Sequence, residues 1–118
     1  LGPAVADLVA VAGGGDQAAY DSATNRYYIG GSRWTQSGFA GNDGACSAAT
    51  PCTPILVVID AATRKVFATP TSGNNAHAVA VDALTHQAYL PYSSAKAPAG
   101  CATCASSPNG GVLVFATQ

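Results

Sequence analysis

Residues 19–29, AYDSATNRYYI, and residues 80–90, AVDALTHQAYL, are two copies of one pattern, 61 positions apart. The matched positions are Asp21 with Asp82, Thr24 with Thr85, Tyr28 with Tyr89 and Ile29 with Leu90. A second match places ILVVID (55–60) on VLVFAT (112–117) with a shift of 57, and we assign the difference in shift to the cysteine-bearing loop. Internal repetition of this kind indicates a structural unit that occurs twice.

Each copy predicts short antiparallel strands. The apolar runs are rich in β-branched and aromatic residues, are separated by polar turns and show no helical period. The chain has no Glu and no Met, which also disfavours long helices. The predicted strands cover residues 54–60 and 65–71 in the first copy and 76–82, 88–94 and 110–117 in the second. This pattern gives four strands per unit, with the second unit ending after its third strand.

Four-stranded antiparallel units in tandem are typical of β-propeller blades, so we expect an all-β fold with two blades of a propeller. A β-sandwich of duplicated hairpins is the alternative. The predicted boundaries are a leading strand with a Gly-rich link in residues 1–15, a first blade in 16–75 and an incomplete second blade in 76–118. Small residues fit the crowded strand nearest the propeller axis. The first strand of each predicted unit has such residues, namely Ala18, Ala19, Ala76, Ala78 and Ala80.

Two blades do not close a ring, because a propeller needs about four or more. The missing blades are expected from a longer precursor or from identical chains. The leading stretch DLVAVA (7–12) has the right length to complete the last sheet, unless another chain does so. Unpaired strand edges and exposed apolar faces would otherwise favour aggregation.

Composition excludes several classes of protein. The chain has 118 residues, is 48% hydrophobic and only 9% charged, and carries a formal net charge of -1. It is too apolar for a disordered segment and too neutral to attract nucleic acid. No stretch approaches the roughly 18 apolar residues that a membrane-spanning helix needs.

Four cysteines form two close pairs, Cys46 with Cys52 and Cys101 with Cys104. We predict a disulfide within each pair, with zinc thiolates and free thiols as the alternatives, because CATC (101–104) also suits a metal. Disulfides persist in oxidising compartments, so we expect a secreted, extracellular or periplasmic protein.

Three stretches resemble the blade signatures of YVTN-type propeller proteins, a group that also takes in streptogramin-lyase-like and gluconolactonase-like repeats. They are DQAAYDSATNRYYIGGS (16–32), PILVVIDAATRKVFATP (54–70) and AHAVAVDALTHQAYLPYSS (76–94). The resemblance implies a secreted propeller but no single activity, since such blades serve lactonases, lyases and cell-surface binding proteins. Members of the family usually carry six or seven blades, so a site built by this chain alone is expected to be incomplete.

Asp16 and His77 occupy equivalent positions under the 61-residue shift, each just before an innermost strand. Projected toward a common axis, they suit a divalent cation such as calcium, with further ligands from other blades, or an acid–base pair for lactone hydrolysis or lyase chemistry. The alternative is structural, with Asp16 capping a turn and His77 bonding a loop carbonyl.

Other polar and aromatic residues lie close to the same predicted ligand face. Exposed aromatic rings can stack on sugars, and amide and carboxylate groups can bond to sugar hydroxyls. The candidate binding residues are Arg33, Trp34, Asn42, Asp43, Asn75 and Tyr92. The alternative for Trp34 is packing under the cysteine loop.

Turn residues are predicted at the opposite end of the strands. Asp21, Asp60 and Asp82 each precede a polar turn that ends in Thr, and we assign them to turns closed by their own side chains. His86 is expected to be a solvated turn residue.

Three functions remain open. The first is a secreted binding or scaffold propeller with its ligand face at the channel mouth. The second is a metal-dependent lactonase- or lyase-like enzyme that uses Asp16 and His77. The third is a propeller subunit that forms oligomers or fibres and binds carbohydrate.

Overall fold

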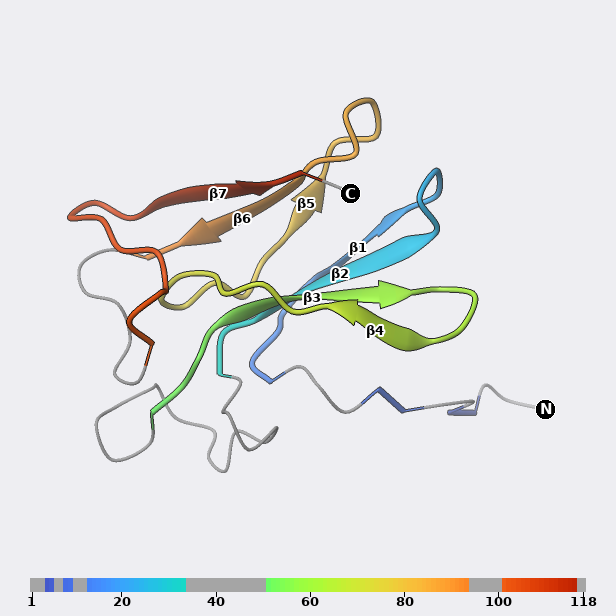
Figure 1. Cartoon of the computed structure of the whole chain (residues 1–118), viewed down its shortest axis with the longest axis horizontal. Helices are drawn as coiled ribbons and strands as arrows, with labels where there is room; N and C mark the ends of the chain where they lie inside the picture. Colours follow the sequence, from blue (N-terminus) through green and yellow to red (C-terminus); the bar gives the residue numbers. More distant parts are fainter. Residues whose placement is uncertain (1–3, 6–7, 10–12, 34–50, 94–100, 117–118) are drawn as a thin grey trace.

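The computed structural model describes residues 4–5, 8–9, 13–33, 51–93 and 101–116, and these form two antiparallel β-sheets without a helix (Figure 1). Sheet 1 has the order β1-β2-β3-β4, and sheet 2 has the order β5-β6-β7. The strands of sheet 1 are β1 (Ala18–Asp21), β2 (Arg26–Gly31), β3 (Ile55–Asp60) and β4 (Lys65–Ala68). Those of sheet 2 are β5 (Ala80–Val81), β6 (Ala88–Tyr92) and β7 (Gly111–Phe115). The all-β class and the three-stranded second unit are confirmed.

In three turns an Asp carboxylate accepts hydrogen bonds from residues of the same turn, as the recurrence of Asp and Thr predicted. In β1–β2 the Asp21 carboxylate accepts bonds from the Ala23 N–H and the Thr24 hydroxyl. Asp60 accepts two bonds from Thr63, and Asp82 accepts the Leu84 N–H. Each turn then reverses through a residue with positive φ. These residues are Asn25 (φ 53°), Arg64 (φ 57°) and His86 (φ 58°).

The strand pairing reproduces the repeat and corrects one part of it. Ala19 pairs with Tyr28 and Ala80 with Tyr89, so the first two strands follow the 61-residue shift. Gly31 pairs with Ile55, however, and Tyr92 with Gly111. Ile55 therefore corresponds to Gly111, a shift of 56 (111 minus 55), and the predicted shift of 57 is wrong. A slip of one residue exchanges the two faces of a strand, so this correction decides which side chains are equivalent.

The innermost strand of sheet 2 is shorter than predicted. Strand structure was expected over residues 76–82, but β5 contains Ala80 and Val81 only. The His77 carbonyl accepts the Asp16 N–H from the other unit, and Asn75 has a φ of 58°. The backbone before β5 thus bonds to the segment before β1 and does not extend the ladder with β6.

The leading strand stays a prediction. Most of DLVAVA (7–12) lies outside the described residues, and the described Leu8 and Val9 belong to no strand. Val5 and Leu8 expose 86% and 79% of their surface. In Figure 1 the described residues 4–5 and 8–9 lie beneath sheet 1, on the side away from sheet 2.

The core lies between the two sheets. Tyr28, Leu56 and Val58 from sheet 1 meet Ala88 and Leu90 from sheet 2. Leu113 and Phe115 pack against this cluster from β7. Full burial of such a side chain contributes about 1.5–3 kcal/mol, so burial of this cluster helps to hold the two sheets together. We call the side of each sheet that lines the core its inward face, and the other side its outward face.

Each sheet is built from one continuous part of the chain, which is compatible with two blades but does not confirm a propeller. In the part of the chain that the structure describes, no helix is long and apolar enough to cross a membrane.

Candidate functional site

The sheets have a loop end and a turn end. The short Asp turns lie at one end of the strands, and the segments before β1 and β5 and after β2 and β6 lie at the other (Figure 1). The candidate ligand residues Asp16, Arg33, Asn75, His77 and Tyr92 all belong to the loop end. Their proximity follows from the alternating strand directions.

Asp16 and His77 are in direct contact. The Asp16 Oδ2 lies 2.7 Å from the His77 Nδ1, and the Asp16 N–H donates to the His77 carbonyl at 3.0 Å. The side chains are 68% and 36% exposed, respectively. The two side-chain groups are not aligned as a hydrogen bond, so the close contact is an ion pair when the ring is protonated. The structure thus joins two residues that lie one repeat apart, and it leaves both side chains partly exposed although the His77 Nδ1 itself is buried.

Glycines explain how the two backbones approach so closely. A Cβ at Gly30 would lie 2.9 Å from the Ala76 carbonyl oxygen and 3.1 Å from the His77 Cα. A Cβ at Gly15 would lie 2.8 Å from the Gly30 carbonyl oxygen. Real Cβ atoms do not tolerate such contacts with backbone, so the absence of a side chain at Gly15 and Gly30 permits the Asp16–His77 contact.

The other candidate ligand residues have mixed surroundings. The Arg33 N–H donates to the Gly13 carbonyl, which fastens the segment before Asp16 to the end of β2. Tyr92 is half-buried and packs against the core cluster, and a Cβ at Gly73 would touch its ring. Asn75 stands two positions before His77 with its backbone in the left-handed region. The sugar-binding roles of these residues stay predictions. Trp34, Asn42, Asp43 and Cys46 lie outside the described residues.

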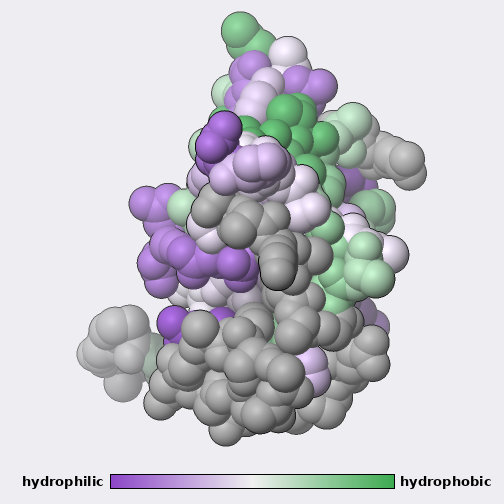
Figure 2. Space-filling view, turned by 90° about the vertical axis from the view of Figure 1, so that its left-hand side faces the viewer, coloured by the Kyte–Doolittle hydropathy of each residue, from purple (hydrophilic) through white to green (hydrophobic). Residues whose placement is uncertain are grey.

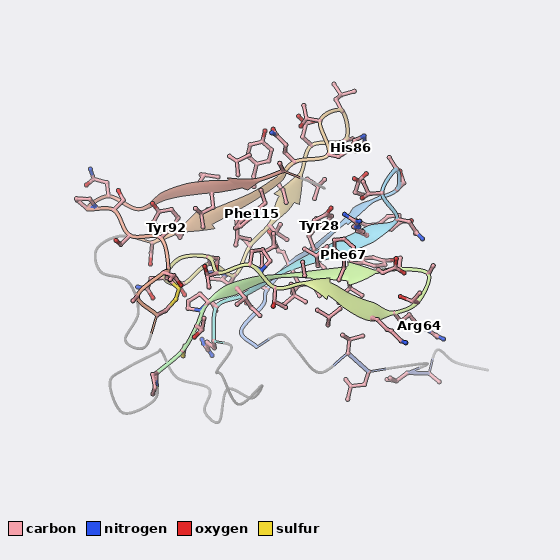
Figure 3. All side chains as sticks on the ribbon, in the orientation of Figure 1. Tyr28, Arg64, Phe67, His86, Tyr92 and Phe115 are labelled. Atoms are coloured by element: carbon pink, nitrogen blue, oxygen red, sulfur yellow. A yellow bond between two sulfur atoms is a disulfide. The ribbon has the colours of Figure 1, made fainter. Side chains whose placement is uncertain are left out.

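At the turn end the prediction for His86 is wrong. His86 is not simply solvated, because its Nδ1 lies 3.0 Å from Asp21 Oδ2 and 3.1 Å from Asp21 Oδ1. The contact links the β5–β6 turn, which contains His86 (Figure 3), to the β1–β2 turn. The His86 side chain is 32% exposed and the Asp21 side chain 3%. No sequence signal marked this pair, since the two residues are not equivalent in the repeat.

The electrostatics of the Asp turns favour charged carboxylates. Burial raises the pKa of Asp21, but hydrogen bonds from Thr24, Ala23 and His86 outweigh it and hold the pKa below the ordinary value. The Thr63 N–H lowers the pKa of Asp60, and the Leu84 N–H lowers that of Asp82. These carboxylates are therefore structural groups whose partners stabilise the ionised form.

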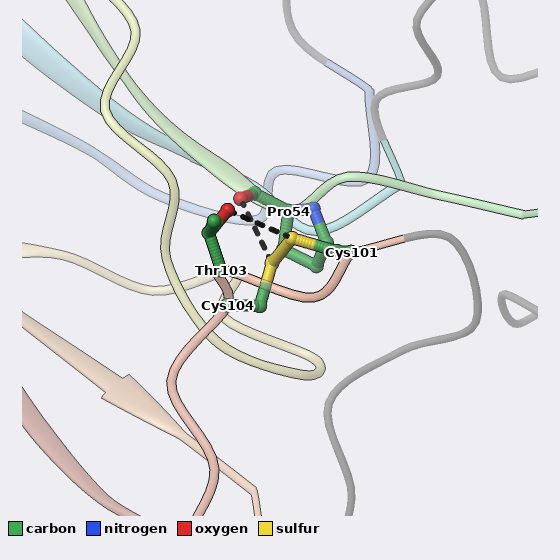
Figure 4. Close-up of a disulfide and its surroundings, with 4 residues drawn as sticks. All are labelled: Pro54, Cys101, Thr103 and Cys104. Carbon is green, nitrogen blue, oxygen red and sulfur yellow. Dashed lines mark hydrogen bonds between the residues drawn. A yellow bond between two sulfur atoms is a disulfide. The ribbon is translucent and has the colours of Figure 1, made fainter.

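A disulfide between Cys101 and Cys104 lies beside sheet 1, with its Cα atoms 5.5 Å apart (Figure 4). The Cys104 Sγ is 3.9 Å from the Pro54 carbonyl oxygen, and the Ala105 N–H donates to the Ser72 carbonyl. The loop before β7 is thereby attached to segments that flank β3 and β4. Cys52 is also disulfide-bonded, while Cys46, its predicted partner, is outside the described residues.

A cavity of about 350 Å³ opens between the sheets beside β4 and β7. Figure 3 shows Tyr28 and Phe67 from sheet 1 and Phe115 from sheet 2 in this region. The Arg26 guanidinium lies 3.7 Å from the centre of the Phe67 ring, and the buried Tyr28 hydroxyl has no hydrogen-bond partner. In the described residues no strand of sheet 2 lies outside β7, which explains the space opposite β4. The sequence repeat predicted the missing strand, but not the cavity.

The donor set at the loop end limits what these residues can bind by themselves. Asp16 and His77 supply one carboxylate and one imidazole. Among the described residues there is no group of three or more His, Cys, Asp or Glu side chains that would hold a metal ion. The predicted divalent cation therefore requires ligands from outside this set.

Comparison with models of known protein families, with curated proteins and with solved structures found no match. The resemblance to YVTN-type propellers accordingly stays a prediction.

Proposed function

We propose that this chain is part of a secreted binding protein of the β-propeller type, and that its loop end binds a polar, carbohydrate-like ligand. The observation that carries the proposal is the contact between Asp16 and His77, which brings an accessible acceptor and an accessible imidazole together from two repeat units.

The chemistry of the pair suits hydroxyl groups. The His77 Nδ1 is buried against Asp16, so the Nε2 is the ring nitrogen left for a ligand. A carboxylate accepts hydrogen bonds only, whereas an Nε2–H donates, so the pair can offer one acceptor and one donor to a diol. Asn75 lies nearby in the chain and adds an amide. Figure 2 shows the loop end, where hydrophilic surface is visible above the grey atoms. A site of this kind binds neutral polar molecules without a strong net charge, in keeping with the formal charge of -1.

The 2.7 Å contact also favours a second candidate function. An aspartate beside one ring nitrogen holds a histidine in place, and the neutral form of that ring can act as a general base through its other nitrogen. Hydrolysis of a lactone is a reaction that such a base supports by activating water. Binding is the better-supported function because it requires only the two residues that the structure brings together.

Glycan-array binding of the purified chain tests the proposal. We expect a defined set of glycans to bind the wild type, and Asp16→Asn or His77→Gln to reduce that binding at least tenfold. Asp60→Asn makes the same chemical change as Asp16→Asn at the turn end and should leave glycan binding unchanged. Binding that survives both loop-end changes, or no binding by the folded wild type, would contradict the proposed site. Turnover of a lactone probe that His77→Gln abolishes would favour the second candidate.

A further inference from the structure

We propose that Ser32 is a positioning residue of the loop-end site, and that its hydroxyl holds Asp16 in place beside His77. The inference rests on the proposed function, in which Asp16 and His77 contact the ligand. Ser32 is itself buried, with 4% of its surface exposed, so it acts through the backbone that leads to Asp16 and not on the ligand.

The segment before Asp16 consists of three consecutive glycines, residues 13–15. Glycine is the residue with the greatest conformational freedom, so three in a row do not define the position of the residue that follows them. Gly14 adopts a φ of 71°, in the left-handed region. Contacts from outside the segment must therefore fix where the Asp16 carboxylate lies.

The end of β2 provides these contacts. The Ser32 hydroxyl donates to the Gly14 carbonyl at 2.8 Å, and the Arg33 N–H donates to the Gly13 carbonyl at 2.9 Å. A Cβ at Gly14 would lie 2.6 Å from the Ser32 Oγ, so the glycine is what allows the hydroxyl to approach. Two successive carbonyls are thus held by β2, and the second of them lies two residues before Asp16.

The second unit repeats this arrangement. Under the 61-residue shift Gly14 corresponds to Asn75, whose φ of 58° is also positive. Ser32 corresponds to Ser93, whose hydroxyl donates to the Asn74 carbonyl at 3.2 Å. In both units a serine that follows the second strand therefore attaches the segment that precedes the first strand.

Two differences give Ser32 the larger role. The Asn74 carbonyl accepts both the N–H and the hydroxyl of Ser93, so the hydroxyl there adds to a bond that the backbone already makes. The hydroxyl of Ser32 instead reaches a carbonyl different from the one that the Arg33 N–H reaches. The second segment also reads Asn-Asn-Ala (74–76), which has less conformational freedom than three glycines. Loss of the hydroxyl should therefore release Asp16 much more than the same loss at position 93 releases His77.

Nuclear magnetic resonance relaxation of the Asp16 backbone N–H tests this role, because the order parameter reports motion within the folded state. We expect an order parameter of about 0.85 in the wild type, falling toward about 0.6 in Ser32→Ala. The Ala61 N–H, which donates to the Asn25 carbonyl at the turn end, should keep its value. Ser93→Ala is the matched control and should leave the Asp16 order parameter unchanged. Ser32→Thr keeps a hydroxyl and should restore it.

Glycan binding gives a second measurement on the same variants. Ser32→Ala should weaken binding about fivefold, because a ligand must then order the Asp16 segment when it binds. This loss is smaller than the loss of at least tenfold expected for Asp16→Asn, since the carboxylate is still present. Ser93→Ala and Ser32→Thr should bind as the wild type does.

Several results would overturn the positioning role. They are an unchanged Asp16 order parameter in Ser32→Ala, an equal fall in Ser93→Ala, a fall throughout both sheets, or a folded Ser32→Thr variant that behaves like Ser32→Ala. Glycan binding that Ser32→Ala leaves at the wild-type level would do so as well. Absence of glycan binding by the folded wild type would instead contradict the proposed function, and the order parameters would still show whether Ser32 holds Asp16.

Discussion

Two histidine–aspartate contacts join the sheets where β1 contacts β5, one at each end of these two strands. At the turn end His86 contacts Asp21, whose side chain is 3% exposed and also accepts bonds from Ala23 and Thr24. At the loop end His77 contacts Asp16, whose side chain is 68% exposed. The residue types are the same at both ends, but their surroundings differ.

Burial separates a structural role from a role in binding. A buried carboxylate needs its hydrogen bonds, because an unpaired buried charge is costly. An exposed carboxylate can exchange its partner for water or for a ligand at little cost. We therefore assign the turn-end pair to stability, whereas recognition by the loop-end pair is part of the proposed function. The same substitution made at both ends tests this division of roles.

The largest expected effect is that of Asp21→Ala. This change removes the acceptor for three groups, and we expect a clear fall in the urea midpoint at neutral pH. Asp16→Ala, the matched change at the loop end, should alter stability by no more than about 0.5 kcal/mol. Equal losses for the two variants would contradict the division of roles.

The pH dependence gives a second readout of Asp21→Ala. The pKa of Asp21 lies below its ordinary value of 3.8. The ionised Asp21 therefore makes its full contribution to the free energy of unfolding above pH 3.8, and this contribution is lost as the pH falls through the folded-state pKa. The gap in urea midpoint between wild type and Asp21→Ala should therefore be constant at neutral pH and narrow in acid. Asp60 and Asp82 have pKa shifts in the same direction, so some acid sensitivity should remain in the variant.

An intermediate effect is expected from replacing both Cys101 and Cys104 by Ser. Closing a loop with a sequence separation of 3 stabilises a fold by about 2 kcal/mol through the entropy of the unfolded chain. Removal of the disulfide should lower local stability most at the loop end, because the hydrogen bond from the Ala105 N–H to the Ser72 carbonyl comes directly after Cys104. Hydrogen exchange should therefore accelerate at Ala105, while the Ala23 N–H in the β1–β2 turn keeps its protection relative to global unfolding.

Thr103→Ala is the control for the disulfide, since it changes the same loop and leaves both cysteines in place. It should keep the wild-type midpoint to within about 0.5 kcal/mol. An unchanged midpoint in the double Ser variant would show that the loop is held by its other contacts and not by the covalent bond.

The sequence predicted what is local and repeated. Each Asp-x-x-Thr turn contains its own hydrogen-bond partners, so Asp21, Asp60 and Asp82 could be assigned without a fold. The Asp16–His77 candidate followed from equivalence, because two residues at the same position before adjacent innermost strands point to the same end of the molecule.

What sequence reasoning missed depends on contacts between the units. The runs ILVVID (55–60) and VLVFAT (112–117) are apolar at nearly every position, so no alternation marked the faces and the register was wrong by one residue. The short β5 results from a backbone bond between His77 and Asp16, which no pattern of side chains shows. His86 could not be paired with Asp21 before the sheets were placed face to face.

The smallest expected effect is the difference between His86→Asn and His77→Asn. Asn tolerates the positive φ of position 86, as Asn25 shows at the equivalent position, so the change removes the ring without adding backbone strain. Loss of the contact with Asp21 should cost about 1 kcal/mol. His77 has no such backbone constraint, its side chain is 36% exposed and its partner is in solvent, so His77→Asn should cost no more than about 0.5 kcal/mol. Urea unfolding of the two variants side by side measures the difference. If His77→Asn proved the more destabilising, the loop-end pair would be a structural contact, and the case for a ligand there would lose its main support.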